Sequence, residues 1–269
     1  MNKMRMSKIS IIFQILTKSI FKPKLVKDVL EERRQNQENE YHRNHEYEYD
    51  FNSIQDFFKN IFPEEKVNEN ELKELEIHVK ENLQKLKNEK YPTKKKPYPT
   101  DYSINSDSRK FLYYLCRILK PKNVVETGVA YGISTSYILQ ALENNKLGKL
   151  YSIDSIFRPW QTKQMIGSLI PKKLKNRWHL IIGKSTDKLE KISTEINNLD
   201  IFIHDSSHTY ENMMFEFNVI IKKIKKGGVL ISDDIIDNDA FYDFTTSNNV
   251  KKYIIKVEGN QGLGVIIKN

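Results

Sequence analysis

The feature that most constrains this sequence is the placement of its glycines. All ten lie between Gly128 and Gly264, and the first 127 residues contain none. Tight βα turns and ligand-binding loops need glycine, whereas helix interiors avoid it. We therefore expect a helical and polar N-terminal extension with a linker over residues 1–100, followed by a compact α/β domain over residues 101–269.

The composition excludes several classes of protein. Hydrophobic residues make up 39% of the chain and charged residues 29%, which suits a folded domain with a full core. No stretch approaches the roughly 18 to 20 uncharged apolar residues of a membrane-spanning helix. The single cysteine, Cys116, excludes an internal disulfide framework and suits a reducing, cytoplasmic compartment.

The N-terminal extension begins with a basic amphipathic segment. Residues 8–21 place isoleucine, leucine and phenylalanine at helical spacing among lysines. Two interpretations stay open, a helix docked on its own protein and a helix that contacts a membrane surface or a partner. We expect residues 31–50 to be polar and exposed, residues 69–90 to form a charged helix, and residues 91–99 to form a linker.

From residue 106 onward, short apolar segments alternate with amphipathic ones, which predicts a parallel sheet with right-handed crossovers. The expected strands are 123–127, 150–154, 178–182, 200–205 and 228–233, and the expected helices between them are 133–145, 160–170, 186–197 and 209–225. Residues 251–258 and 263–268 are two further strands whose link is so short that they form an antiparallel hairpin.

The loop after the first strand carries the clearest binding signal. Gly128 and Gly132 let the backbone approach a ligand where a helix begins. Glu126 could pair with a ligand ammonium group, and Ser134 could offer its hydroxyl to a carboxylate. Together they suit the zwitterionic methionine end of S-adenosylmethionine, although a tight turn before a capped helix would use the same residues.

The next two strands end in residues suited to a nucleoside. Asp154 is placed to accept both ribose hydroxyls of such a cofactor, or else to cap the following helix. After the third strand, Gly183 and Ser185 form a loop in which the serine could reach an adenine edge. Read alone, that serine could equally be an N-cap.

Acids end the fourth and fifth strands, which are neighbours in the expected order. Asp205, Asp233 and Asp234 would emerge side by side and repel one another without a cation. Such oxygen ligands favour Mg²⁺ or a similar ion, while helix capping is the alternative. His208 could be a general base with a pKa near working pH, or a structural histidine. We expect His204 to point away and to be structural.

Residues 106–269 resemble the class I S-adenosylmethionine-dependent O-methyltransferases, both the metal-dependent catechol type and the sugar type related to macrocin O-methyltransferase. The motif E-T-G-x-x-x-G-x-S matches the family's first cofactor motif at Glu126, Gly128, Gly132 and Ser134. The resemblance implies a Rossmann-like fold with a helical N-terminal extension, and S-adenosylmethionine and Mg²⁺ as cofactors. It assigns the ribose to Asp154, the adenine loop to Gly183 and Ser185, a cofactor and metal contact to Asp205, and the metal to Asp233 and Asp234 as well. Catechol-type enzymes use a lysine base, so His208 favours the sugar type.

The sequence therefore predicts an O-methyltransferase that acts on a hydroxyl of a small polar acceptor, such as a sugar or a glycosylated metabolite. Mg²⁺ would bind the acceptor hydroxyls, and His208 would take the proton. The net charge of +9 motivates an alternative, an RNA methyltransferase. Because the basic residues are dispersed and no RNA-binding module is evident, nucleic acid is not the expected partner. A non-catalytic interaction protein on the same fold is a further alternative, and homo-oligomerisation stays open.

Overall fold

The computed structural model describes residues 15, 17, 23–66, 68–100, 104–248 and 250–269. The basic segment predicted over residues 8–21 lies outside this part of the chain except for Ile15 and Thr17. Among the described residues, none of the helices has the length and apolar character needed to cross a membrane.

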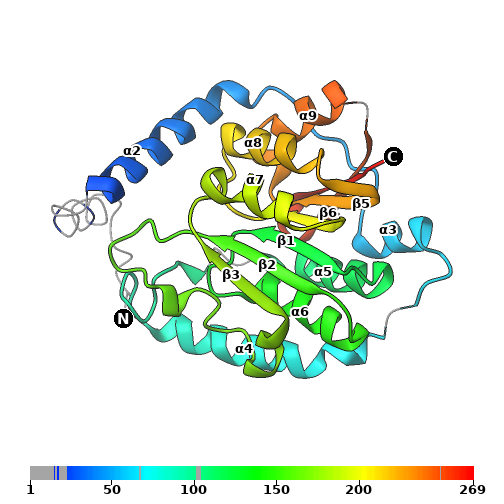
Figure 1. The fold of residues 1–269 in the computed structure, drawn as a ribbon, viewed down its shortest axis with the longest axis horizontal. Coiled ribbons are helices and arrows are strands. Elements are labelled where there is room, and N and C mark those ends of the chain that lie inside the picture. The colour runs from blue at the N-terminus through cyan, green and yellow to red at the C-terminus, as the bar shows by residue number, and fades with distance from the viewer. Residues whose placement is uncertain (1–14, 16, 18–22, 67, 101–103, 249) are drawn as a thin grey trace.

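A seven-stranded sheet forms the centre of the molecule, in the order β3-β2-β1-β4-β5-β7-β6 (Figure 1). The strands are β1 (Asn123–Thr127), β2 (Lys149–Asp154), β3 (Trp178–Ile182), β4 (Leu199–His204), β5 (Ile224–Ser232), β6 (Lys251–Val257) and β7 (Gln261–Ile267). The first five strands are parallel, and β7 is antiparallel to both β5 and β6. This confirms the predicted fold class. Strand order reverses between β1 and β4, so ligands are expected at the carboxyl ends of these strands.

Helices cover both faces of the sheet (Figure 1). One face carries α4 (Lys73–Asn88), α5 (Ser106–Leu119) and α6 (Ile133–Asn145); the other carries α7 (Ser185–Glu195), α8 (Tyr210–Ile220) and α9 (Ala240–Asn248). Successive strand residues serve opposite faces, because side chains alternate along a strand. Val124 of β1 belongs to the first core and Val125 to the second.

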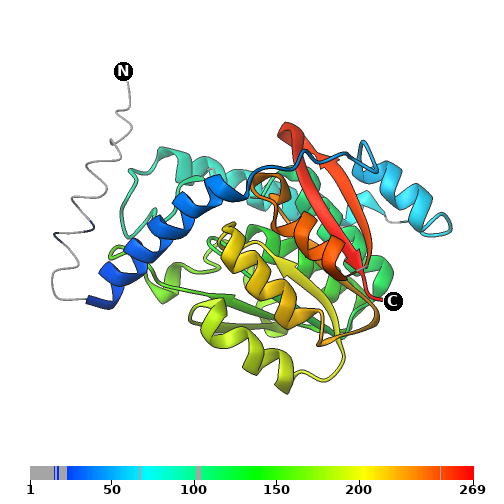
Figure 2. The ribbon, with the colours of Figure 1, turned by 90° about the horizontal axis from the view of Figure 1, so that it is seen from above.

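The hydrophobic core continues across residue 100, the predicted boundary of the N-terminal extension. Phe57 of α3 (Ile54–Ile61) and Leu75 and Val79 of α4 are buried in the same cluster as Phe111 of α5. After α2 (Pro23–Glu38), the chain passes along the β6 edge of the sheet, as Figure 2 shows. The expected helix over residues 69–90 is present as a 3₁₀ turn, η2 (Glu69–Leu72), that leads into α4.

The helix predicted over residues 160–170 is wrong. That segment contains only the short 3₁₀ helix η4 (Lys163–Met165), and its backbone bonds to the glycine loop instead of to itself. The amide of Gly167 donates to the carbonyl of Ala130, and the amide of Leu169 donates to that of Tyr131. Gly167 also has a positive φ of 66° and faces the Trp178 ring, where a Cβ would lie 2.4 Å from a ring carbon. This loop therefore supports the ligand-binding edge.

Candidate active site

A cleft of about 1100 Å³ opens where the parallel strands end. The glycine loop after β1, the ends of β2 and β4, and the loop after β5 line it, and α2 supplies an outer wall. Nine residues singled out from the sequence line this cleft: Gly128, Ser134, Asp154, Gly183, Ser185, Asp205, His208, Asp233 and Asp234. The topology therefore gathers most of the predicted site at one place.

The glycine loop is held close to the end of β4. Gly128 has a positive φ of 86°, and a Cβ placed on it would lie 1.8 Å from the carbonyl oxygen of Asp205. Gly132 also has a positive φ, 83°, and is the residue from which α6 begins. Only glycine fits the first of these positions without moving backbone. The β1 and β4 loops can therefore form two adjoining walls of one cleft.

Asp154 holds the same loop from the β2 side. Its carboxylate accepts hydrogen bonds from the backbone amides of Val129 at 3.1 Å, Ala130 at 2.8 Å and Ser155 at 2.6 Å. Burial raises the pKa of Asp154 to about 6, although these hydrogen bonds act in the opposite direction. Each carboxylate oxygen can accept more than one hydrogen bond, so Asp154 can bind this loop and a ribose at once. The ribose contact itself stays a prediction.

Glu126 lies beneath the cleft and, in the described structure, does not line it. Its side chain is only 1% exposed and accepts hydrogen bonds from the hydroxyls of Thr135 at 2.8 Å and Ser152 at 2.5 Å. Burial raises the pKa of Glu126 to about 7. The geometry thus gives Glu126 a role in joining β1, β2 and α6, and it does not direct the carboxylate toward a ligand ammonium group.

We expect Glu126→Gln to stabilise the protein at pH 8 by about 2 to 3 kcal/mol. The pKa of this carboxyl is about 7 in the folded chain, against an ordinary value near 4.5. The wild type therefore loses stability as pH rises from 4.5 to 7, whereas glutamine keeps the acceptor oxygen and carries no charge. Thermal unfolding at pH 5 and pH 8 checks this: a difference between the two proteins that does not grow with pH would contradict it.

Ser134 and Ser185 have different surroundings. Ser134 is buried and lines the cleft in the first turn of α6. Ser185 begins α7 and donates a hydrogen bond to the side-chain oxygen of Asn212 at 3.1 Å. That bond joins α7 to α8 below the loop containing Gly183, so the serine is engaged with the protein. Its predicted contact with adenine stays a prediction.

The three acids at the ends of β4 and β5 all line the cleft. Burial raises the pKa of Asp205, Asp233 and Asp234, and the negative charge of Asp234 raises the pKa of both other acids. Asp233 also accepts a hydrogen bond from the hydroxyl of Ser108 on α5 at 3.0 Å. The donor chemistry therefore suits a hard cation. However, within the described part of the chain no group of three or more His, Cys, Asp or Glu side chains is arranged to hold a metal ion.

His208 lies between two of these acids. Its Nε2 is 3.9 Å from Asp205 Oδ1 and its Nδ1 is 3.8 Å from Asp234 Oδ2, so neither contact is a hydrogen bond. The side-chain amides of Asn39 and Asn238 donate to its backbone carbonyl at 3.1 and 3.0 Å. Burial lowers the pKa of His208 to about 3, in place of the ordinary histidine value that we expected. The imidazole is therefore neutral at physiological pH, which leaves a lone pair to accept a proton.

His204 is structural, as expected: it lies outside the described residues that line the cleft, although its ring packs against that of His208. Its ring is fully buried, and its centroid is 5.2 Å from that of His208, with the two planes nearly perpendicular. The Nδ1 atom of His204 is 2.7 Å from Oε2 of Glu216 on α8. Sequence alternation along β4 placed His204 on the opposite face from Asp205, but the chain turns after this residue and brings His208 back beside it.

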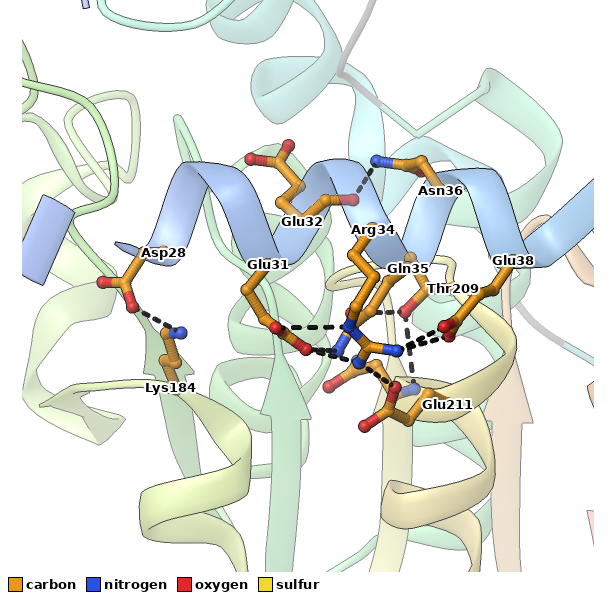
Figure 3. Close-up of polar contacts among 11 residues, drawn as sticks. Asp28, Glu31, Glu32, Arg34, Gln35, Asn36, Glu38, Lys184, Thr209 and Glu211 are labelled. Carbon is orange, nitrogen blue, oxygen red and sulfur yellow. Dashed lines mark hydrogen bonds and ion pairs between the residues drawn. The ribbon is translucent and has the colours of Figure 1, made fainter. Parts of the chain in front are cut away.

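Helix α2 forms a wall that the sequence analysis missed. None of its side chains is buried, and polar contacts attach it to α7 and α8 (Figure 3). Asp28 pairs with Lys184 at 2.6 Å, and Arg34 pairs with Glu211 at 2.7 Å. The Thr209 hydroxyl donates to Gln35 at 3.0 Å. Because α2 buries no apolar face, it has no apolar periodicity to predict it from; the spacing of its Glu and Arg residues was the available signal.

Several solved methyltransferase structures are similar to this protein. The chain is similar to an O-methyltransferase from Bacillus cereus in complex with SAH, with 17% identity, a TM-score of 0.55, and coverage of 81% of this chain and 98% of that one. It is similar to TomG from Streptomyces achromogenes, an O-methyltransferase of tomaymycin synthesis in complex with SAM (17%, TM-score 0.54, 81% and 97%). It is also similar to SAH-bound PaMTH1, a methyltransferase from Podospora anserina (12%, TM-score 0.51, 76% and 98%).

These similarities show that the chain has the class I methyltransferase fold. Residues 125–235 match the family model described as "Methyltransferase domain". That region contains the glycine loop, Asp154, Asp205, His208 and both acids after β5, so the expectation of a methyltransferase is confirmed. No curated protein sequence matches the chain.

Proposed function

We propose that this protein transfers the methyl group of S-adenosylmethionine to a hydroxyl of a small polar acceptor, such as a sugar or a glycosylated metabolite. The observation that carries this proposal is that the region matching a methyltransferase domain also forms the cleft. The part of the chain that matches a methyltransferase domain supplies the strand ends that build the cleft. The cleft then has a nucleoside-type loop at β1 and β2 and a neutral histidine at β4.

Different residues of the cleft would bind the cofactor and take the proton of the acceptor. The glycine loop, held by Asp154, would bind the cofactor at the start of α6. The sulfonium already activates its methyl group, so the protein must align the acceptor oxygen with it and remove a proton. The neutral imidazole of His208 can take that proton from an acceptor hydroxyl. Asn39 and Asn238 fix the backbone of this histidine.

The charge of the outer wall favours a small molecule over RNA as the acceptor. Glu31 and Glu32 of α2 line the cleft, together with Glu40 of the 3₁₀ helix η1 (Asn39–His42) and Glu211 of α8. Arg34 pairs with Glu31 and Glu211, and Arg158 pairs with Glu32. These arginines are already engaged with carboxylates and are not free to bind the phosphates of a polynucleotide. The net charge of +9 therefore does not extend to the mouth of the site.

We expect Asp154→Ala to weaken the binding of S-adenosylhomocysteine by about 1 to 3 kcal/mol, through lost charge-assisted hydrogen bonds. Part of this loss would be indirect, because the variant also releases the amides of Val129 and Ala130. Calorimetric titration measures it. Asp187→Ala is the matched control, because Asp187 is exposed on α7 and does not line the cleft. Unchanged affinity in folded Asp154→Ala would refute the ribose assignment.

A divalent cation is a finer part of the proposal. Mg²⁺ would be held by Asp205, Asp233 and Asp234, and when bound it would lower the pKa of an acceptor hydroxyl. Burial raises the pKa of each acid, and the charge of Asp234 adds to this for Asp205 and Asp233; a cation would relieve that repulsion, which supports this part of the proposal. We expect Mg²⁺ to raise the melting temperature at pH 8, and Asp234→Asn to reduce that increase. A melting temperature that Mg²⁺ does not change, together with full activity in excess chelator, would show that the protein uses no divalent cation.

Methyl transfer itself can be tested before the acceptor is identified. The full-length protein is incubated with S-adenosylmethionine labelled at the methyl group and with metabolite extracts, and the products are analysed by mass spectrometry. We expect the label in a small polar product, on oxygen. Label in RNA, or no transfer despite cofactor binding, would contradict the proposal and favour one of the two alternatives.

A further inference from the structure

A segment between α4 and α5 is fixed to the ligand-binding edge of the sheet. It comprises residues 91–98, and two side chains from that edge hold its backbone. The indole of Trp160, in the loop after β2, donates a hydrogen bond to the carbonyl of Pro97 at 3.0 Å. The hydroxyl of Tyr131, in the glycine loop, donates to the carbonyl of Tyr98 at 2.8 Å and accepts from its amide at 3.3 Å. The segment therefore has a defined position against the glycine loop.

The segment ends in a buried tyrosine that lines the cleft. Tyr98 is only 2% exposed, and its ring packs against that of Tyr131, with the centroids 5.2 Å apart and the planes nearly perpendicular. Within the described part of the chain, its hydroxyl is buried and has no hydrogen-bond partner. Such groups are rare, because each loses its hydration without compensation. The hydroxyl is therefore available for a partner that the protein alone does not supply.

The carboxylate of Asp154 indicates where that partner lies. Burial raises the pKa of Tyr98, and the negative charge of Asp154 adds to this effect, so the phenol stays protonated and can donate a hydrogen bond. Because Coulomb interactions weaken with distance, the effect places the hydroxyl on the Asp154 side of the cleft. A group that lies between the two must donate to the carboxylate and accept from the phenol. A ribose hydroxyl does both.

We infer that Tyr98 binds the cofactor, its hydroxyl donating a hydrogen bond to a ribose hydroxyl that in turn donates to Asp154. The inference deepens the proposed function and rests on it, because it takes S-adenosylmethionine as the ligand. It adds to the site a residue that lies outside residues 125–235, the part that matches the methyltransferase domain. The chain before α5 would then contact the cofactor directly, in addition to supplying the outer wall through α2.

Tyr98→Phe tests the inference, because it removes the hydroxyl and keeps the ring and the backbone hydrogen bonds of the segment. The full-length protein is titrated by calorimetry at pH 8 with S-adenosylhomocysteine and with methylthioadenosine, which keeps the ribose and the adenine but lacks the amino-acid end. We expect the variant to bind both about 5- to 30-fold more weakly than the wild type. The melting temperature of the ligand-free variant should equal or exceed that of the wild type, because the lost hydroxyl had no partner there.

Tyr113→Phe is the matched control. Tyr113 is a buried tyrosine of α5 that does not line the cleft, and its hydroxyl donates a hydrogen bond to Glu71. We expect this variant to melt at a lower temperature than the wild type and to bind both ligands with unchanged affinity. The two substitutions remove the same atom, so opposite effects on stability and affinity separate a ligand contact from a structural one.

Equal affinity of Tyr98→Phe and the wild type for S-adenosylhomocysteine would overturn the inference and leave the proposed function standing. A loss seen with S-adenosylhomocysteine but not with methylthioadenosine would place the contact at the amino-acid end and also overturn it. So would a melting temperature of ligand-free Tyr98→Phe that falls as far as that of Tyr113→Phe, because the protein itself would then satisfy the hydroxyl. Absence of binding by the wild type would overturn the proposed function and the inference together.

Discussion

Replacing His208 with alanine is expected to slow methyl transfer by about 10²- to 10⁴-fold, the usual contribution of a positioned general base. The side chain lies in the cleft between Asp205 and Asp234, and the carbonyl of this residue is held by two asparagine side chains. Binding of S-adenosylhomocysteine should be nearly unchanged, because the cofactor loop is built by other residues. The initial rate of label transfer into a fixed extract measures the effect, with calorimetry as the binding check.

The pH dependence sharpens this prediction. Burial lowers the pKa of His208, so its lone pair stays available at every pH above that lowered value. We therefore expect no loss of rate from His208 protonation between pH 8 and pH 6. His179→Ala, at an exposed histidine on β3, serves as the control and should keep the wild-type rate. A near-wild-type rate for His208→Ala would place the base elsewhere.

Replacing Gly128 with alanine is expected to disrupt the cofactor site and to destabilise the fold. The new Cβ would lie 1.8 Å from the carbonyl oxygen of Asp205, so the β1 and β4 loops would have to separate. Backbone strain and overpacking together should cost about 2 to 5 kcal/mol of folding free energy. The displaced loop should weaken S-adenosylhomocysteine binding by about 100-fold. Thermal unfolding and calorimetry measure the two effects.

Gly227→Ala is the matched control for this change. Gly227 has a similar positive φ of 74°, but nothing lies within 4 Å of the position that its Cβ would take. We expect it to cost only the strain of the left-handed conformation, about 1 to 2 kcal/mol, and to leave cofactor binding unchanged. Equal effects of the two substitutions on binding would show that the contact between the β1 and β4 loops does not shape the site.

Strand and loop positions were predictable from the sequence where a local pattern is tied to a single physical cause. Short apolar segments such as the one with Val124 and Val125 must pack on both faces of a parallel sheet, and they do. The glycine loop was predictable because glycine permits a positive φ. The residues beside it in the cleft, such as Asp154, were predictable because they end neighbouring strands. The gathering of Asp205, Asp233 and Asp234 followed from strand order alone.

Features that depend on contacts between distant residues could not be predicted in the same way. Helix α2 has polar contacts in place of an apolar face, so hydrophobic periodicity did not show it. Glu126 follows an apolar strand, as a ligand-binding acid would, but Thr135 and Ser152 draw it into the core. His204 was expected to be structural, and it is, but nothing in the sequence indicated that its partner is Glu216. Each of these outcomes depends on a hydrogen-bond or ion-pair partner in another helix or strand.

We expect the cleft at the carboxyl ends of β1 and β2 to bind S-adenosylmethionine. Calorimetric titration of the full-length protein with S-adenosylhomocysteine tests it most directly, since no acceptor is needed. We expect saturable binding of one molecule per chain, weakened in Asp154→Ala and in Gly128→Ala but not in Asp187→Ala or Gly227→Ala. Absence of binding by the folded wild type, or binding that all four variants retain equally, would contradict it.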